Sequence, residues 1–506
     1  MDTSAQTIIY SGMAGFAVDI ECRITNGLPS FSIVGSVSRS IDEARERVRS
    51  AYDSTHLTFP KKRIVINIAP ADIAKNGTSL DLGIAVSILA TNEKIDLSLM
   101  QTFVYIGELG LDGSVRSVRG LIGMILTGKQ LGMTQFVVPR ANLAQAQAIP
   151  GISIIAVDNF QELVLFLSRQ HELQIIRTDP LVVEIAKSRS VPVGIDIRDI
   201  VGQEQAKRAL EIAVAGGHNV LLVGPPGTGK SMLAKAARYL LPPLNADEVL
   251  EVSHLYSLCR ENYESIITER PFRAPHHSAS HVSITGGGNF IKPGEVSLSH
   301  RGILFLDELP EFSRSTIESL RQPLEERTIT VSRAHSSADF PADFMLIGTA
   351  NPCPCGNYGS AQNCSCTIYQ IERYQHKLSG PILDRIDMYC GVDLIDHARI
   401  LRDNSSETSD VIAKRVQKAR DLQSARYGSK SLCNSNMSNE DIKNHAQLDT
   451  GAGAILDTAA RKLNLSIRSY MRTIKVARTI ADLSDSARIT QAHISEALQY
   501  RQRHAS

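Results

Sequence analysis

Residues 224–231 read Gly-Pro-Pro-Gly-Thr-Gly-Lys-Ser, which matches the phosphate-binding pattern G-x-x-x-x-G-K-[ST]. The apolar run NVLLV precedes this loop, and MLAKAARYL, a helical pattern, follows it. A strand, a glycine-rich loop and a helix in this order let backbone N–H groups surround phosphates at a positive helix terminus. Lys230 would add a point charge, and the Ser231 hydroxyl would ligate Mg²⁺. A chance match in a glycine-rich turn is the alternative, and the two correct flanks argue against it.

Two further apolar runs end in polar residues suited to the same chemistry. The run ILFLDE places Asp307 and Glu308 at the carboxyl end of a predicted strand. There Asp307 would hold Mg²⁺ through water, and Glu308 would act as general base on the attacking water. The run FMLIGTAN offers Asn351 to orient that water or to contact the γ-phosphate. A strand cap for the acids and a turn role for Asn351 are the simpler alternatives. Together with the phosphate loop, these residues favour a magnesium-dependent nucleotide hydrolase.

The chain divides by pattern into several parts. Its 506 residues are enough for about three or four domains. Short β-rich runs and two helical patterns predict a mixed α+β domain over residues 1–168 that begins with a hairpin-rich sheet. We place a linker at 169–195. Residues 196–404 have the buried-strand pattern of a doubly wound α/β core with a parallel sheet, and 405–506 are mostly helical. The predicted fold class is therefore α/β and multidomain.

The charge and hydropathy of the sequence indicate the compartment of the protein and limit the kinds of partner that it can bind. Lys and Arg number 54 and Asp and Glu number 53, so any nucleic-acid surface must be a local patch. The first residues do not read as a signal peptide, and no apolar run reaches about 18 residues. We therefore expect a cytoplasmic protein with no membrane partner.

Four of the eight cysteines are close together in the sequence: Cys353, Cys355, Cys364 and Cys366. In a reducing compartment such a group indicates a metal before disulfides. Four thiolates would hold a structural Zn²⁺ in a closed tetrahedral site without a catalytic role. The spacing is tighter than the usual C-x₂₋₄-C, so free cysteines or a redox-sensitive pair are the alternatives.

Several stretches resemble AAA+ ATPases of the magnesium-chelatase-like group, which also includes the minichromosome maintenance helicases. These stretches are IVGQEQAKRALEIAVAGGHNVLLVGPPGTGKS, FRAPHHSAS, FLDELPEF, LRQPLEE, GTANPCPCG and LSGPILDRID. Together with the amino-terminal part, nearly the whole chain resembles the ComM/YifB family of competence proteins. The resemblance implies an AAA+ P-loop core with a helical C-terminal lid, and ATP and Mg²⁺ as cofactors. It also implies a homohexameric helicase that drives DNA branch migration in recombination during natural transformation.

The resemblance extends to individual residues. Arg385 in ILDRID matches the arginine finger that a neighbouring subunit donates to the hydrolysing site, and a salt bridge to Asp384 or Asp387 is the alternative. In SIRSYMRTIKVARTIADL, Arg468 best matches the sensor 2 arginine, and Arg472 is the second choice. The candidate nucleotide-binding residues are Val201, Gly202, Gly224, Pro225, Pro226, Gly227, Thr228, Gly229, Lys230, Ser231 and Met232.

Two hairpin inserts of this group face the ring channel, and they map onto residues 282–299 and 326–340. Lys292, Arg333 and His335 are therefore candidates for contacts with DNA phosphates. An ordinary solvated hairpin residue is an equal alternative for each of them. Residues 414–430 carry six basic residues and one acidic residue, a pattern that usually marks a solvated helix face.

The amino-terminal part resembles the Lon-protease fold in KNGTSLDLGIAVSILA, GELGLDGSVRSVRG and QFVVP, with Ser79 at the position of the nucleophile. Ile122 stands where the lysine base is expected, and a Ser–Lys dyad cannot work without an amine. We interpret residues 1–168 as a proteolytically inactive, Lon-protease-like domain. A DNA motor is thus the leading hypothesis. The alternative is an ATPase that remodels a protein partner, as in magnesium chelatase, whose motor subunit lacks this extension. An ATP-dependent protease or chaperone is the third class, and Ile122 opposes it.

Overall fold

The computed structural model describes residues 4–35, 39–55, 57–71, 75, 77–92, 95–178, 194–259, 263–288, 291–333, 336–359, 363–378, 380–394 and 407–501. The chain forms two compact units. The first contains Met1–Lys187, Val249–Thr268 and His335–Asp339, and the second contains Ser188–Glu248, Glu269–Ala334 and Phe340–Ser506. The first unit therefore includes two short segments that fall inside the sequence of the second.

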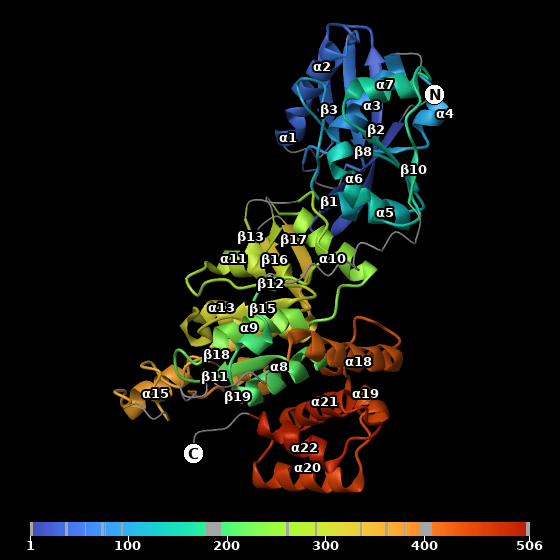
Figure 1. Ribbon diagram of the computed structural model, residues 1–506. Coiled ribbons are helices and arrows are strands. Elements are labelled where there is room, and N and C mark those ends of the chain that lie inside the picture. The colour runs from blue at the N-terminus through green and yellow to red at the C-terminus, as the bar shows by residue number, and fades with distance from the viewer. Residues whose placement is uncertain are drawn as a thin grey trace. The chain divides into compact units, whose positions relative to one another are not determined.

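The first unit is built on a mixed eight-stranded sheet in the order β10-β9-β8-β5-β1-β2-β4-β3 (Figure 1). Its strands are β1 (Ser4–Ser11), β2 (Ala14–Thr25), β3 (Ser30–Val34), β4 (Arg63–Ala69), β5 (Val104–Tyr105), β8 (Gln135–Pro139), β9 (Ser153–Val157) and β10 (Ile176–Arg177), with a separate hairpin of β6 (Glu108–Leu109) and β7 (Val115–Arg116). Its helical segments are α1 (Arg39–Asp42), α2 (Ala44–Ser54), α3 (Asp81–Asn92), α4 (Leu97–Met100), α5 (Leu121–Gln130), η1 (Arg140–Asn142), α6 (Leu143–Gln147) and α7 (Phe160–Leu167). Helix α3 is apolar on nearly every side and almost wholly buried, as expected for a core helix.

Strand β3 departs from the hairpin-rich sheet that the sequence predicts. β1 and β2 do form an antiparallel hairpin, in which Ser4 lies opposite Glu21. β3 instead pairs in parallel with β4, and Ser30 lies opposite Arg63. β2 is paired with β1 along one edge and with β4 along the other, so β3 does not pair with β2 and instead extends the sheet at the outer edge of β4.

The sheet also continues beyond residue 168. β10 pairs antiparallel with β9, so that Ile176 lies opposite Ile154. This edge strand falls inside the segment that the sequence pattern suggests as a linker.

The position expected for a protease base is part of the core. Ile122, in α5, is completely buried in an apolar cluster with residues such as Ile125 and Phe136. Ser79, the aligned nucleophile, is only 5% exposed. Ile122 therefore packs as a core residue and offers no amine.

Residues 249–268, which follow the phosphate-binding loop in sequence, complete the packing of the first unit. Leu250 and Ile266 pack against the apolar cluster that contains α5. The hydroxyls of Ser117 and Tyr263 are 2.6 Å apart, and the Gln145 side-chain amide donates to the carbonyl of Tyr263 at 2.5 Å. The first unit thus depends on a segment that is distant from it in sequence.

The second unit centres on a parallel five-stranded sheet in the order β12-β15-β18-β11-β19, which confirms the predicted parallel core (Figure 1). Its strands are β11 (Val220–Val223), β12 (Phe272–Arg273), β15 (Ile303–Leu306), β18 (Met345–Ala350) and β19 (Met388–Gly391). The two hairpins, β13 (Gly286–Gly287) with β14 (Lys292–Pro293) and β16 (Thr328–Arg333) with β17 (Ser336–Pro341), form separate small sheets, and β17 up to Asp339 counts with the first unit. The core helical segments are η3 (Ile197–Asp199), α8 (Glu204–Gly216), α9 (Lys230–Ala237), η4 (Arg238–Leu240), α11 (His281–Thr285), α12 (Glu295–Leu298), η5 (Leu309–Glu311), α13 (Arg314–Ser319), α14 (Arg321–Glu326), α15 (Ile368–Gln375) and α16 (Gly380–Leu383). Helix α10 (Ala246–Ser257) starts in this unit, and its residues from Val249 on belong to the first unit.

The parallel register brings three strand ends together. Val223 of β11 lies opposite Ala350 of β18, and Leu306 of β15 lies opposite Gly348. β15 and β18 are buried along their whole length, as their apolar sequences predict. The phosphate-binding loop, Asp307 and Asn351 therefore all start from the carboxyl edge of this sheet.

A helical region follows the core and forms the C-terminal end of the second unit (Figure 1). Its segments are α18 (Ser409–Tyr427), η6 (Asn434–Asn436), α19 (Asn439–His445), α20 (Thr450–Lys462), α21 (Ile467–Leu483) and α22 (Gln491–Gln499). Among the described residues, no helix has both the length and the apolar character that a membrane crossing requires.

The basic run at 414–430 lies on and just after α18, and ion pairs hold much of it. Arg415 contacts the carboxylates of Glu211 and Glu407, each at 2.6 Å. Lys418 lies 2.7 Å from Asp485. Arg415 thus links α18 to α8, whereas the Lys418 pair is well exposed and lies on a solvated face of the helix.

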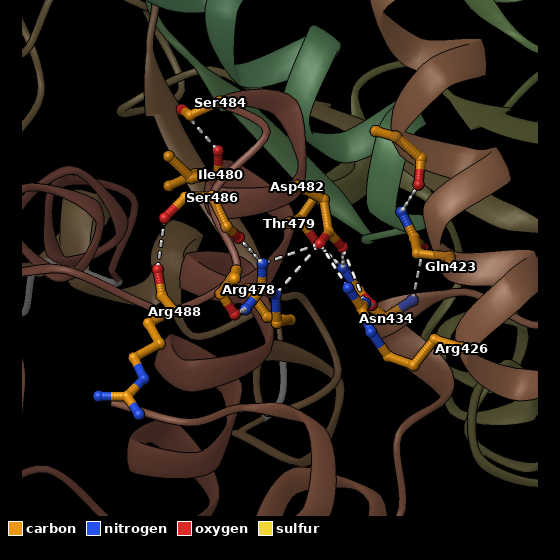
Figure 2. Close-up of polar contacts among 12 residues, drawn as sticks. Gln423, Arg426, Asn434, Arg478, Thr479, Ile480, Asp482, Ser484, Ser486 and Arg488 are labelled. Carbon is orange, nitrogen blue, oxygen red and sulfur yellow. Dashed lines mark hydrogen bonds and ion pairs between the residues drawn. The ribbon is translucent and has the colours of Figure 1, made fainter. Parts of the chain in front are cut away.

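A buried polar network joins α18, η6 and α21, and Figure 2 shows its side chains converging on Asp482. Arg478 and Arg426 donate to the Asp482 carboxylate at 2.9 Å and 2.6 Å. Asn434 donates to the same carboxylate at 2.8 Å. The side chains of Asp482 and Arg478 are only 1% and 2% exposed and Arg426 is 15% exposed, so one buried carboxylate is the shared counterion of two guanidinium groups.

Replacing Asp482 by alanine should lower the free energy of unfolding by about 3–5 kcal/mol, because two cations lose their buried counterion. Asp485→Ala is the matched control, since its pair with Lys418 is well exposed and should cost less than about 1 kcal/mol. Denaturant unfolding followed by circular dichroism measures both variants. Equal losses in the two variants would contradict the role assigned to Asp482.

Candidate nucleotide-binding and hydrolysis site

The phosphate-binding loop connects the end of β11 at Val223 to the start of α9 at Lys230. Gly227 and Gly229 have φ angles of 77° and 88°, in the left-handed region that favours glycine. A Cβ atom built on either of them would meet no atom within 4 Å, so the loop offers open space next to its backbone. At Gly224 a Cβ would come within 2.0 Å of the Val392 carbonyl oxygen. The glycines thus fit a loop that is open to phosphate on one side and packs against Val392, just after β19, on the other.

Lys230 is folded into this loop. Its ammonium donates to the carbonyls of Gly224 and Pro225 at 2.7 Å and 2.6 Å, and to Oδ1 of Asn351 at 3.3 Å. Burial lowers the pKa of Lys230, and the charges of Asp307 and Glu308 act in the opposite direction. The structure therefore brings the predicted lysine and the predicted asparagine together.

Asp307 lies beside the first turn of α9. Its Oδ2 accepts from the Ser231 hydroxyl at 2.9 Å, and its Oδ1 accepts from the Thr349 hydroxyl at 2.6 Å. A hydroxyl and a carboxylate side by side are hard oxygen ligands of the kind that Mg²⁺ prefers. The structure thus brings the predicted Ser231 and Asp307 together.

Glu308 has an uncommon backbone conformation for a residue with a side chain, with φ 52° and ψ 50°. Its N–H donates to the hydroxyl of Thr349 at 2.8 Å, and the following turn η5 is built around it. Non-glycine residues in this region carry strain and often mark functional sites. Thr349 was not among the candidates, although it stands inside GTAN, because only the tertiary structure shows that it contacts both Asp307 and Glu308.

The turn before α8 also contacts the loop. Gly202 and Gln203 both have left-handed backbones, and the Gln203 amide donates to the carbonyl of Asp393 at 2.6 Å and of Thr228 at 3.3 Å. The candidate Val201 is half-buried beside this turn, and Met232 on α9 is 41% exposed. Gln203 is a supporting residue that sequence reasoning missed, although IVGQ was part of the resemblance.

The three arginines predicted from the resemblance share one cavity with Glu325. Arg385, Arg468 and Arg472 line a cavity of about 600 Å³ together with Glu325. Arg385 and Arg468 both pair with Oε1 of Glu325, and the Arg468 distance is 2.8 Å. Hydrogen bonds from Arg385, and then from Arg468, lower the pKa of Glu325. Among the described residues that line this cavity, none belongs to residues 224–231.

Arg385 and the two arginines of α21 differ in their surroundings. The Arg385 side chain is 11% exposed and Arg468 is 49% exposed. Arg472 donates to the backbone carbonyls of Asp384 and Ile386 at 2.7 Å and 2.5 Å. Arg472 therefore positions the loop that carries Arg385, whereas Arg468 shares a carboxylate with Arg385 at the edge of the cavity.

The four clustered cysteines come together in space. Their Sγ atoms all lie within 4.8 Å of one another, so this group is able to bind a metal ion such as Zn²⁺. Cys353 is buried and the other three are partly buried.

The structure describes only some of the residues that were predicted to contact DNA. Lys292 begins β14, is half-buried and lies opposite Gly287 in the first hairpin. Arg333 ends β16, and its side chain lies outside the described part of the chain, as does all of His335.

Three family models match this chain in succession. They are described as subunit ChlI of Mg-chelatase over residues 20–142, magnesium chelatase subunit ChlI over 196–400, and magnesium chelatase subunit ChlI C-terminal over 406–501.

Relatives of similar length match nearly the whole chain. The competence protein ComM of Haemophilus influenzae is 40% identical over 505 residues, which cover 98% of this chain and 97% of that protein. The uncharacterized protein YifB of Salmonella typhimurium is 41% identical over 487 residues, covering 96% of this chain and 94% of that protein. The YifB protein of Escherichia coli is 40% identical over 486 residues, with the same coverage of 96% and 94%.

Proposed function

This chain belongs to the ComM/YifB family of proteins with magnesium-chelatase ChlI domains, and from that premise we propose that it is an ATP-driven motor that moves on DNA. The family is one of AAA ATPases, which implies ATP hydrolysis. The proposed activity is that of a homohexameric helicase. Such a ring would extend heteroduplex DNA by branch migration during natural transformation, in the cytoplasm.

The proposed cofactors of hydrolysis are ATP and Mg²⁺, and the loop geometry fits them. Lys230 and the N–H groups of residues 224–231 would hold the phosphates, while Ser231 and Asp307 would hold the metal. When bound, Mg²⁺ neutralises charge on the phosphate oxygens. Glu308 would orient the attacking water and accept its proton, and Asn351 would contact the γ-phosphate.

The observation that carries the proposal is that the cavity lined by Arg385 and Arg468 is not lined by any described residue of the phosphate-binding loop, 224–231. Lys230 and Asn351 meet at the carboxyl edge of the sheet, whereas Arg385 and Arg468 pair with Glu325 in that cavity. An arginine that stabilises the transferred phosphoryl group has to reach it directly. A neighbouring subunit that supplies Arg385 and Arg468 would complete the site, and this favours a ring.

The DNA part of the proposal rests on the family and on charge. The name of the Haemophilus relative refers to competence, the state in which cells take up DNA. We propose that the two hairpins place Lys292 and Arg333, with His335, on DNA phosphates, because contacts of this kind need no base sequence. The first unit would be a proteolytically inactive Lon-protease-like domain that supports the ring.

The test is the ATPase rate without DNA and with single-stranded, duplex or four-way junction DNA, together with displacement of a labelled strand from the junction. We expect DNA to raise the rate and the junction to be processed only with ATP. Lys230→Ala is the control for ATP dependence, since it removes the charge that holds the phosphates. An ATPase that ignores every DNA and moves no strand would contradict the proposal and favour a motor that remodels a protein partner.

A further inference from the structure

The loop after β18 brings four thiols into a small volume next to the nucleotide site. Cys353 and Cys355 have Sγ atoms 3.4 Å apart, and Cys364 lies 3.7 Å from Cys353 and 3.6 Å from Cys355. Cys366 completes the group, because all four sulfurs lie within 4.8 Å of one another. Two C-x-C pairs, separate in sequence, therefore point their sulfurs at one centre.

These distances fit a single metal ion. A Zn–S bond of about 2.3 Å gives a tetrahedron with edges of about 3.8 Å, close to the three printed separations. A disulfide would need about 2.05 Å between two sulfurs. Sulfurs on different irons of a cluster would spread farther than a shared single ion allows. The backbone N–H of Tyr358 also donates to Sγ of Cys353 at 3.3 Å, which suits a sulfur that carries negative charge.

We propose that Cys353, Cys355, Cys364 and Cys366 hold one structural Zn²⁺, and that this ion braces the phosphate-binding loop. Binding forms four Zn–S bonds and converts four thiols to thiolates, and their protons pass to solvent. The site is closed by four protein ligands, so the ion takes no part in hydrolysis. The second half of this inference rests on the proposed ATP site.

Two contacts connect the cysteine loop to that site. Gly356, between the cysteine pairs, has φ 83°, and a Cβ built on it would lie 2.5 Å from Cδ of Pro226 in the phosphate-binding loop. Asn351, two residues before Cys353, accepts from Lys230 at 3.3 Å. A bound ion would fix the chain between these two contacts. Losing the ion should therefore loosen both Pro226 and Lys230.

The metal is tested by elemental analysis of protein purified reduced and without chelator. We expect about one zinc per chain in the wild type and in Cys22→Ser, a cysteine on β2 outside the cluster. Cys355→Ser and Cys364→Ser should lose most of it. A wild type with no zinc, or with iron in its place, would overturn the assignment.

The effect of the cysteine loop on the phosphate-binding loop is tested with variants that keep all four cysteines. Gly356 and Gly359 have similar left-handed backbones, φ 83° and 77°, but a Cβ at Gly359 would meet nothing within 4 Å. Gly356→Ala should keep its zinc yet bind a fluorescent ATP analogue with Mg²⁺ roughly tenfold more weakly than Gly359→Ala, because it crowds Pro226. Equal affinities in the two variants would overturn the brace.

Metal removal completes the test. A chelator should weaken nucleotide binding by the wild type, and added Zn²⁺ should restore it, whereas unchanged affinity of the zinc-free protein would overturn the coupling. A wild type that contains zinc but binds no nucleotide would contradict the proposed ATP site and leave the metal site standing. The two proposals therefore fail in different ways.

Discussion

Replacing Glu308 by glutamine should nearly abolish ATP hydrolysis but leave nucleotide bound. The amide keeps the size of the side chain and removes the group that would accept a proton from water, so the turnover rate should fall by about 10²–10⁴-fold. Asp307, Ser231 and Lys230 are unchanged, and nucleotide affinity should stay within a few-fold of the wild type. Steady-state ATPase assays and binding of a fluorescent ATP analogue measure the two quantities.

Glu311→Gln is the matched control for this variant. Glu311 lies in the same turn, η5, and its carboxylate pairs with Lys377 at 3.0 Å near the surface. It should hydrolyse ATP at nearly the wild-type rate. Normal turnover in Glu308→Gln, or equal loss in both variants, would show that Glu308 is not the base. Lys230→Ala should differ from both by failing to bind nucleotide.

Arg385→Ala should bind ATP normally and lose hydrolysis by about 10³-fold or more, the usual contribution of an arginine finger. The loss follows from missing positive charge at a neighbour's site and not from a damaged phosphate-binding loop. Arg461→Ala, an exposed arginine on α20, is the control and should keep full activity. Full activity of Arg385→Ala would contradict the shared-site arrangement.

Mixing two inactive variants separates a shared site from a self-contained one. Arg385→Ala subunits keep an intact phosphate-binding loop, and Lys230→Ala subunits keep an intact Arg385. If a neighbour supplies the arginine, a mixed assembly contains some complete sites, and activity should return on mixing. An arginine that acts within its own subunit would leave the mixture as inactive as its parts.

The residues of the site that come directly after a buried strand could be predicted from the sequence. Residues 224–231, Asp307 and Asn351 each end a buried strand, and parallel strands carry such ends to one edge of the sheet. The apolar runs of β15 and β18 predicted that sheet, because strands buried on both faces are apolar throughout.

The contacts between distant segments were not predictable from local pattern. Glu325 stands in a surface helix, α14, and nothing in LRQPLEE indicates that its carboxylate pairs with arginines from 385 and 468. Similarly, the basic run on α18 does not indicate that Arg415 pairs with Glu211 of α8 or that Lys418 pairs with Asp485, which follows α21. Charge patterns show which ions a segment carries, but partners from other segments depend on tertiary packing.

Because the first unit includes residues 249–268, its folding depends on how far synthesis on the ribosome has progressed. The packing of the first unit includes Leu250, Tyr263 and Ile266, which are made only after the phosphate-binding loop. Residues 1–187 therefore leave the ribosome with an incomplete core and have to wait for about 80 more residues, roughly 4–16 s at 5–20 residues per second. Co-translational folding of this protein should thus not proceed one unit at a time from the N-terminus, and a chain cut shortly before residue 249 should expose apolar surface and aggregate.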